Sequence, residues 1–408
     1  MPRKKKGRER GNGEGTISQR KDGTWCAAIT AGRKEDGKLK RVFFYGKTRE
    51  EVAQKLTKAL ADIQQGTYVE PSKLTVGEWL DTWLKDYARP HIRPSTWQNY
   101  EMIIRVHIKP AIGGLQLKQL QATHLQRLYN DLREHGRVDG QGGLSARTVR
   151  ITHVVIHAAL KQAMKEGLVA RNVAEATTLP RQQKKELRVL TLEEEQRFMT
   201  AVAGDRLGAA FLLDLATGMR LGELLALRWQ DVDLKEGVIR VRRALSRVKV
   251  PDGPTKTALI FQEPKTAKGK RSIPLPEWAI ATLKAHKARQ AQEKLLLGPA
   301  YQDNGLVFAT EEGKPVEPRN FTRKFYQLRE KAGLPKDVNF HALRHTYATR
   351  LLEANEHPKV VQELLGHSQI SMTLDTYSHV LPELKKAAAA KLNNLWPTEK
   401  IPSIAEGK

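Results

Sequence analysis

At two places in the second half of the chain, a glycine interrupts a helical spacing of apolar residues and a basic residue follows within two positions. At each place the glycine must end one helix, and the basic residue lies at the break. The first place is the string ATGMRLGELLALRWQDVDL. Thr217-Gly218 breaks the chain, and Arg220 then starts a new helix whose leucines lie on its other side. Glu223, three residues further on, is placed to brace the Arg220 guanidinium or the helix start. The string predicts an arginine presented at a helix N-terminus.

The second place is the string VNFHALRHTYATRLLEANEHPKVVQELLGHSQISMTLDTYSHV. His341 and Arg344 are three residues apart, so on a helix they share one face. Gly366 is expected to end the VVQELL helix in a left-handed cap, and His367 follows it directly. Tyr377 comes ten positions after His367 (377 minus 367). The string predicts helices that direct two histidines and a second arginine toward one site.

Between these strings, GVIRVRRAL and ALIFQEPKTAKGKRSIPLP alternate in the manner of strands. Lys265-Thr266 and Gly269 predict a basic turn, and we expect Lys265 at a hairpin between the last two strands. A lysine on a turn can donate a proton, which an arginine cannot, because arginine does not deprotonate in proteins. Lys256, Lys268 and Lys270 lie nearby and compete for that role.

Arg220, Lys265, His341, Arg344, His367 and Tyr377 together are suited to one chemistry, the exchange of a phosphodiester. That exchange needs cations on the non-bridging oxygens, an in-line nucleophile and an acid for the leaving oxygen. A phenol, with a pKa of about 10, is a poor nucleophile without cationic surroundings. Taken singly, an arginine is more often a surface residue and a tyrosine a packed one, so the combination carries the interpretation. His345 and Tyr347 are the rivals, and their helical apolar neighbours favour packing.

Composition limits the partner and the number of domains. The 408 residues are enough for two or three domains. Lys plus Arg number 70 against 45 Asp plus Glu, a net charge of +25, which favours nucleic acid as partner. There is no long apolar run and no signal peptide, so we expect a soluble, cytoplasmic protein and no membrane partner. The single cysteine, Cys26, excludes an internal disulfide and is expected to be an ordinary strand residue.

The N-terminal part has two sections. Residues 1–14 are basic and glycine-rich, and we expect a disordered tail that either follows phosphates or only aids solubility. Residues 15–66 read as three antiparallel strands followed by a helix, with a capping box at Thr48 and Glu51. Basic side chains crowd the strands and turns, and a basic ribbon can enter a major groove, although an inert basic surface is the alternative. The residues selected for DNA contact are Arg20, Lys21, Lys38, Lys40 and Arg41.

The remaining sections follow the proline and glycine signals. Residues 73–176 show four helical patterns, which predict a compact bundle with the tryptophans at 79, 83 and 97 in its core. Its basic side chains would clamp one face of a duplex, and Arg147 and Arg150 are selected as contacts. Residues 177–188 read as an exposed linker, 189–385 as a further domain, and 386–408 as a C-terminal helix and tail. That helix either packs locally or makes assembly contacts.

These strings resemble the phage integrase family, the tyrosine recombinases. The pattern T-G-x-R-x-x-E-L-x-x-L-x-W at Arg220 is similar to the family motif, as are K-T at Lys265, H-x-L-R at His341, L-G-H at His367 and S-x-x-T-x-x-x-Y at Tyr377. All six site positions carry the family's standard residue types, and the resemblance runs from about residue 15 to near the end. The choice of Lys265 among the nearby lysines depends on it.

The resemblance also implies a fold. The K-D-G-T-W turn, Lys21 to Trp25, is similar to the arm-type DNA-binding domain in front of many phage and conjugative-element integrases. The runs H-I-K-P and G-L-V-A-R-N-V are similar to their core-binding domain. We therefore expect a multidomain α+β protein, mainly α with small β-sheets: an arm-type sheet with one helix, a helical core-binding bundle, and a mixed, mainly α catalytic domain.

What the resemblance implies about activity is site-specific recombination that integrates or excises a mobile element such as a prophage. Tyr377 would attack the scissile phosphate to form a 3'-phosphotyrosine and free a 5' hydroxyl. Arg220, Arg344 and His367 would stabilise charge, while Lys265 and His341 would move protons. The covalent bond conserves the phosphodiester energy, so no cofactor, neither ATP nor a metal, is expected.

The implied partners are double-stranded DNA attachment sites of core and arm type, with four protomers exchanging strands through a Holliday junction in a bacterial cell. Excisionase and DNA-bending host factors are possible accessory proteins. Two other functions stay open at this point. A type IB topoisomerase would use similar chemistry on one duplex, but the arm-like domain argues against it. A DNA-binding regulator without catalysis would keep the charge, but the intact set of six argues against it.

Overall fold

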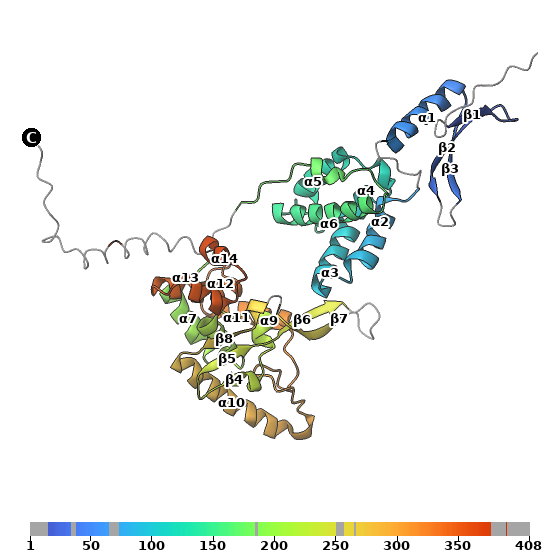
Figure 1. Ribbon diagram of the computed structural model, residues 1–408. Helices are drawn as coiled ribbons and strands as arrows, with labels where there is room; N and C mark the ends of the chain where they lie inside the picture. Colours follow the sequence, from blue (N-terminus) through green and yellow to red (C-terminus); the bar gives the residue numbers. More distant parts are fainter. Residues whose placement is uncertain are drawn as a thin grey trace, which may run out of the picture. The chain divides into compact units, whose positions relative to one another are not determined.

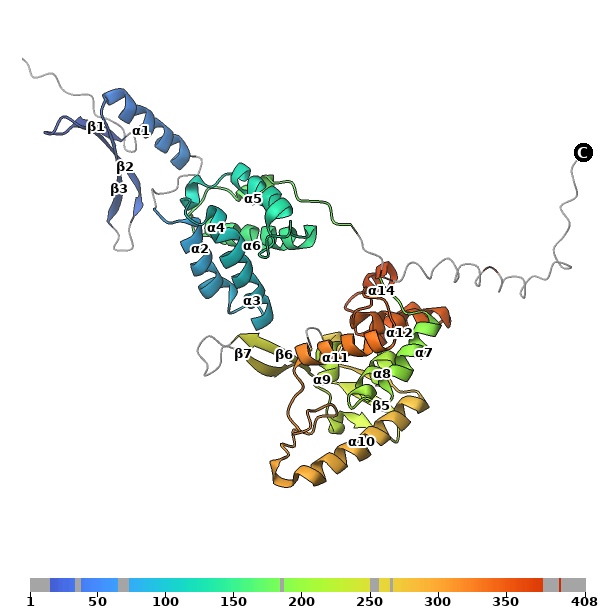
Figure 2. The same cartoon turned by 180° about the vertical axis from the view of Figure 1, so that it is seen from behind.

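The computed structural model describes residues 15–33, 38–64, 73–183, 187–249, 257–264, 267–376 and residue 389. The chain divides into two compact units, Met1–Gln182 and Gln183–Lys408. Figures 1 and 2 show them from opposite sides. Within the described ranges, no helix is both long and apolar enough to cross a membrane.

The first unit begins with a three-stranded antiparallel sheet in the order β1-β2-β3, followed by α1, as predicted. Alternation divides the sheet into two faces. Ala27, Ile29 and Val42 lie on the inner face and pack against Val52 and Leu56 of the helix. The bounds are β1 Thr16–Gln19, β2 Trp25–Arg33, β3 Leu39–Gly46 and α1 Arg49–Gln64.

The strand position of Cys26 and the capping box at Thr48 and Glu51 were both predicted from the sequence. Cys26 is a half-buried strand residue paired with Tyr45, as predicted. The capping box is only half formed: Thr48 Oγ1 accepts from the Glu51 N–H at 3.2 Å, but Glu51 Oε2 accepts from the N–H of Lys47 at 3.0 Å instead of from Thr48. Lys55 also holds the Glu51 carboxylate, at 2.7 Å, and this competes with the reciprocal bond.

A helical bundle completes the first unit. Its core contains Trp79 and Trp83, and Trp79 Nε1 donates to the Ala159 carbonyl oxygen at 2.9 Å, so the tryptophans are core residues as predicted. Trp97 is half-buried against the same core. The bounds are α2 Val76–Thr82, α3 Pro94–Ile103, α4 Lys109–Ile112, α5 Ala122–His135 and α6 Ala146–Lys165, with 3₁₀ turns at Leu117–Gln119 and Val173–Ala176.

The helix that begins with α3 runs on through Pro110 and ends at Gly113. Two π-helical turns, Trp83–Ala88 and Ile104–Ile108, continue α2 and α3, and the second leads directly into α4. The N–H of Lys109 bonds to the Ile104 carbonyl oxygen, five residues back. This wider turn directly before Pro110 accommodates a residue that lacks an N–H, so the helix continues to the glycine pair at Gly113.

The second unit is mainly helical around an aromatic core, in which Phe211 stacks on Phe321 with ring centroids 4.6 Å apart. The helices are α7 Leu192–Val202, α8 Gly208–Thr217, α9 Leu221–Leu225, α10 Glu277–Leu297, α11 Pro318–Lys331, α12 His341–Glu353, α13 Pro358–Leu365 and α14 Ile370–Thr376. In both views α10 lies at the end of this unit opposite α12, α13 and α14 (Figures 1 and 2). Shorter 3₁₀ turns are Trp229–Asp231, Ala267–Gly269 and Gly298–Ala300.

The strands of this unit correct the predicted hairpin. β4-β5-β8 form one antiparallel sheet, and β6 pairs with β7 in a separate ribbon, so the last two strands do not pair with each other. Val241 of β5 pairs with Arg271 and Ala244 of β6 pairs with Gln262, so β7 and β8 lie on different partner strands. Lys265 lies outside the described residues. The strands are β4 Val232–Asp233, β5 Val238–Val241, β6 Ala244–Lys249, β7 Thr257–Gln262 and β8 Arg271–Pro274.

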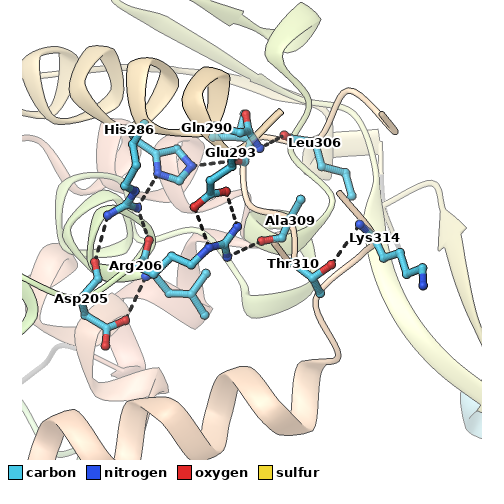
Figure 3. Close-up of polar contacts among 12 residues, drawn as sticks. Asp205, Arg206, His286, Gln290, Glu293, Leu306, Ala309, Thr310 and Lys314 are labelled. Carbon is cyan, nitrogen blue, oxygen red and sulfur yellow. Dashed lines mark hydrogen bonds and ion pairs between the residues drawn. The ribbon is translucent and has the colours of Figure 1, made fainter. Parts of the chain in front are cut away.

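A polar network fixes α10 to the chain before α8 and to the segment before α11 (Figure 3). Arg206 donates to both carboxylate oxygens of Glu293, at 2.8 and 2.7 Å, and to the Ala309 carbonyl oxygen at 2.8 Å. The buried ring of His286 contacts the Val307 carbonyl oxygen at 2.7 Å. Since a two-pronged pair with a carboxylate is geometrically specific, Arg206 holds this end of the unit in one arrangement.

Candidate active site

Arg220 stands at the N-cap of α9, as the sequence predicts. Gly218 ends α8 in the left-handed region, with φ 57°, and this turns the chain sharply before the next helix. Glu223 braces both the helix start and the guanidinium: its Oε2 accepts from the Arg220 N–H at 3.1 Å and its Oε1 from Arg220 Nη1 at 2.8 Å. The Arg220 side chain is 40% exposed, so the brace leaves part of the guanidinium accessible to a ligand.

Glu223 is buried, with 4% of its surface exposed, and stays ionised. Burial would raise the pKa of its carboxyl, but Arg271 and then Arg220 outweigh burial and lower that pKa. Arg271 Nη2 lies 2.9 Å from Glu223 Oε2. Sequence reasoning did not find Arg271, because its position in the strand pattern resembles that of an ordinary surface residue.

Arg344, on the first turn of α12, joins two distant parts of the site. It is 2% exposed, and its guanidinium donates to the Gly218 and Leu365 carbonyl oxygens, the second at 2.7 Å. Those residues precede Arg220 and His367 by two positions each. Arg344 therefore connects the segment that precedes Arg220 to the segment that precedes His367.

His341 begins α12 and shares its exposed side with His345, whose ring centroid lies 4.9 Å away at an interplanar angle of 89°. The ring of His341 reaches solvent, yet protein atoms and two arginines surround its inner side. Partial burial, followed by the charges of Arg344 and Arg220, lowers the pKa of His341 to about 4. The imidazole of His341 is therefore neutral at pH 7.

His367 follows Gly366, which ends α13 in the left-handed cap that the sequence predicts, with φ 65°. The ring is 9% exposed, and its Nδ1 lies 2.9 Å from Thr373 Oγ1. Burial, then Arg344, Arg220 and Arg271, lowers the pKa of His367 to about 3. The Thr373 hydroxyl thus engages Nδ1, and the direction of this hydrogen bond determines which ring nitrogen of the neutral imidazole carries the proton.

The structure brings four of the six selected residues together: Arg220, Arg344, His341 and His367. Arg220 Nη2 donates to the Gly366 carbonyl oxygen at 3.1 Å, and both arginines lower the pKa of both histidines. Tyr377 lies outside the described residues, directly after the last residue of α14, and Lys265 lies outside them as stated above.

The two rivals for catalytic roles are packed residues. Tyr347 lies against a small cluster of buried apolar side chains that includes Leu352 and Val361, and burial raises the pKa of its hydroxyl to about 12. Arg271 and Arg344 act on the Tyr347 hydroxyl in the opposite direction, but burial outweighs them. His345 is half-buried beside His341.

An open hollow of about 630 Å³ is lined by residues 240–243, 261–263 and 270–272 and carries strong positive charge. Two of its arginines, Arg242 and Arg243, have nitrogens 3.5 and 3.7 Å from the buried carboxylate of Asp231. Arg242 and Arg243 were not among the DNA-contact residues predicted from the sequence, although the run R-V-R-R at residues 240–243 is rich in positive charge. The basic side chains of the hollow are Arg240, Arg242, Arg243, Lys270 and Arg271.

The DNA-contact residues selected from the sequence lie in two places. On the N-terminal sheet, the face away from α1 carries exposed Arg41, Phe43 and Tyr45, and the Arg20 guanidinium lies 5.3 Å from the Tyr45 ring centroid. Lys21 is exposed in the turn after β1, Lys38 is exposed directly before β3, and Lys40 is in β3.

In the helical bundle, Arg147 is exposed and Arg150 half-buried on α6.

Comparison with known proteins agrees with this arrangement. Residues 188–383 match the phage integrase family, and residues 75–133 match the phage integrase N-terminal SAM-like domain. A tyrosine recombinase XerC-like protein of Caldanaerobacter subterraneus is 36% identical over 380 residues, which cover 90% of this chain and 95% of that protein.

Solved structures share the fold. A Tn1549 transposon integrase in complex with transposon right end DNA aligns with a TM-score of 0.64 and 24% identity, covering 78% of this chain and 99% of that one. A lambda integrase tetramer bound to a Holliday junction aligns with a TM-score of 0.54 and 22% identity, covering 87% and 96%. The predicted multidomain α+β fold is confirmed. Given the relative of 36% identity along nearly the whole chain and the two family models matched in order, the chain belongs to the phage integrase family of tyrosine recombinases.

Proposed function

We propose that this recombinase is an integrase that cuts and rejoins DNA at specific attachment sites and so inserts or excises a mobile element. The observation that carries the proposal is the joining of Arg220, Arg344 and His367 through adjacent backbone carbonyls, with nearby His341 neutral. A cluster of fixed donors in a partly buried site stabilises charge that develops on a phosphate.

In the proposed cleavage step, the Tyr377 hydroxyl oxygen attacks the scissile phosphorus. A bond forms between that oxygen and phosphorus, and the bond from phosphorus to the 5' oxygen breaks, which leaves a 3'-phosphotyrosine. Rejoining reverses the step with the 5' hydroxyl of a partner strand as nucleophile. The number of phosphodiester bonds is conserved, so the exchange proceeds without an external energy source.

The two histidines take different parts in this proposal. Neutral His341 accepts the proton of the Tyr377 hydroxyl as it attacks, which an imidazolium could not do. Neutral His367 donates its Nε2–H to a non-bridging phosphate oxygen, since Thr373 occupies Nδ1. Arg220 and Arg344 supply the permanent positive charge, and Lys265 gives its proton to the departing 5' oxygen.

DNA binding is proposed for three basic surfaces. The outer face of the N-terminal sheet, with Arg20 and Arg41 beside exposed aromatic rings, suits the major groove of an arm-type site. Arg147 and Arg150 on α6 and the basic hollow that contains Arg242 and Arg243 suit the backbone of the core site. A homotetramer on DNA in the bacterial cytoplasm, with excisionase and bending proteins as accessory factors, completes the proposal.

A nicked suicide duplex carrying the attachment site tests the proposal. The wild-type chain should become covalently attached to the 3' side of the scissile phosphate, and Tyr377→Phe should form no adduct while it binds the duplex equally well. If Tyr377→Phe still forms the adduct, or the wild type forms none, the proposed chemistry is wrong. Cleavage without recombination between two sites would indicate a topoisomerase instead.

A further inference from the structure

Three successive carbonyl oxygens at the end of α13 each accept a hydrogen bond from a different arginine. Leu364 accepts from Arg271 Nε, Leu365 from Arg344 Nη2, and Gly366 from Arg220 Nη2. The last carbonyls of a helix have no partner within it and carry the negative end of its dipole, so cations are favourable there. Two of these arginines belong to the proposed phosphate site, and Arg271 is the third.

Arg271 also reaches the group that holds Arg220. Its Nη2 lies 2.9 Å from Glu223 Oε2, while Glu223 Oε1 accepts from Arg220 Nη1 at 2.8 Å. The side chains of Arg271 and Glu223 are 6% and 4% exposed. Removing one partner from a buried ion pair leaves an uncompensated charge. Without Arg271, the Glu223 carboxylate would shift or take up a proton, and Arg220 would lose the fixed acceptor that holds its guanidinium.

The close approach of Arg271 also explains why residue 366 has no side chain. A Cβ at Gly366 would lie 3.0 Å from both Arg271 Nη1 and the Lys268 carbonyl oxygen. Lys268 Nζ donates to the Ser368 carbonyl oxygen at 2.9 Å. Lys268 and Arg271 thus contact the chain both before and after His367 in the sequence.

We propose that Arg271 is a positioning residue, which fixes Arg220 and His367 relative to each other by binding Glu223 on one side and the Leu364 carbonyl on the other. Its three guanidinium nitrogens donate to the Leu364 and Gly269 carbonyl oxygens and to Glu223, so its effect on the site is exerted through these groups. The proposal depends on the proposed function, because its effect is on the cleavage of DNA.

The test compares Arg271→Gln and Arg271→Lys with Arg206→Gln in the full-length protein. Arg206 is a matched control, because it also pairs with a carboxylate and a backbone carbonyl, but at the α10 end of the same unit (Figure 3). Three quantities are measured: the free energy of unfolding, the Kd for the attachment-site duplex, and the single-turnover rate of adduct formation on the suicide duplex.

A substrate with a methylphosphonate at the scissile position supplies the decisive comparison, since it lacks one charged non-bridging oxygen. Arg271→Gln should bind DNA within about threefold of wild type and cleave the phosphodiester at least about tenfold more slowly. Its deficit should shrink on the methylphosphonate, because less charge then needs the Arg220 cation. Arg206→Gln should lose stability but cleave both substrates at rates close to wild type.

Each result has one meaning. Equal deficits on both substrates, or wild-type cleavage by Arg271→Gln, would overturn the positioning role. If Arg271→Gln does not fold, Arg271→Lys decides: a lysine reaches one acceptor at a time, so we expect a smaller deficit with the same dependence on the substrate, and wild-type behaviour would contradict the proposal. If the wild type itself forms no Tyr377-dependent adduct, the proposed function has failed, which is a separate outcome.

Discussion

The ring of Tyr347 packs directly over Gly218, so closely that a Cβ on the glycine would lie 2.5 Å from the ring carbon Cδ1. Gly218 also has φ 57° and offers its carbonyl oxygen to Arg344. One position therefore combines a left-handed backbone, a close ring contact and the support of a site arginine. Only glycine satisfies all three, because any side chain would push the ring or the turn away.

Gly218→Ala should lower the free energy of unfolding by about 2–5 kcal/mol, since a left-handed alanine costs about 1–2 kcal/mol and overpacking about 1–3 kcal/mol. Adduct formation should fall as well, because Arg344 shifts with the carbonyl. Urea unfolding measures the first effect and the suicide duplex the second. Gly305→Ala, with φ 66° and open space, isolates the backbone cost, and Gly204→Ala, with neither constraint, should be neutral. Equal losses for Gly218→Ala and Gly305→Ala would contradict the role of the ring contact.

Asp214, behind the site on α8, is fully buried, and neither of its carboxylate oxygens has a hydrogen-bond partner among the described residues. Burial raises the pKa of its carboxyl well above the usual value, and Arg344 offsets this only in part. A carboxyl whose folded pKa exceeds its unfolded pKa destabilises the fold as pH rises above the unfolded value of about 3.9. Asp214→Asn should therefore be more stable than wild type at pH 8, and the gap should narrow toward pH 4. Urea unfolding at several pH values measures this, and a gap that widens on acidification would show the opposite sign.

His367 gives the opposite dependence on pH in the same unit. The pKa of its ring falls from 6.5 to about 3 on folding, so protonation favours the unfolded chain. The resulting loss of stability is absent above pH 6.5 and grows as pH falls, by at most about 1.4 kcal/mol per pH unit. His367→Gln removes this dependence, so wild type should lose stability faster than the variant between pH 6.5 and 5. The same urea series, with His357→Gln as an exposed-histidine control, measures the difference, and parallel curves would refute the shift.

The sequence was informative wherever the cause of a structure lies within a few residues. The turn at Gly218, the start of α9 at Arg220 and its brace by Glu223 all come from one short string, and the left-handed cap at Gly366 comes from another. The tryptophan core of the bundle could be predicted because helical periodicity determines which side chains are buried. Each of these features depends on near neighbours in the chain.

Features that depend on distant partners were missed or wrong. Alternation identified the strands but not their pairing: β7 and β8, which were expected to form a hairpin, belong to two different sheets. Arg271 is identified only by partners 48 and 93 positions away, Glu223 and Leu364. Sequence patterns give elements, whereas pairing and buried polar contacts depend on the tertiary fold.

Arg206 and Glu293 should be coupled energetically, because their two-pronged pair joins α10 to the chain before α8 (Figure 3). Their side chains are 25% and 20% exposed, so solvent screens the pair only partly. A double-mutant cycle with Arg206→Gln and Glu293→Gln should give a coupling of about 1–2 kcal/mol in urea unfolding. The exposed pair Lys314 and Glu312, at 49% and 59%, is the control and should give less than about 1 kcal/mol. Equal coupling energies for the two pairs would contradict the proposed role of the Arg206–Glu293 pair in joining α10 to the chain before α8.

The two faces of the N-terminal sheet should separate DNA binding from stability. Tyr45 is exposed on the outer face beside Arg20, whereas Phe44, the preceding residue, packs toward α1. Tyr45→Ala and Arg41→Ala should weaken binding to an arm-site duplex about tenfold or more while the sheet stays folded, because these side chains contact little of the protein. Phe44→Ala should instead destabilise this part of the chain, as loss of a core-facing ring does. Binding is measured by fluorescence anisotropy at fixed salt and folding by circular dichroism of the same samples. Tyr45→Ala and Arg41→Ala proteins that keep full arm-site affinity would place the DNA contact on another surface, since the inner face is covered by α1.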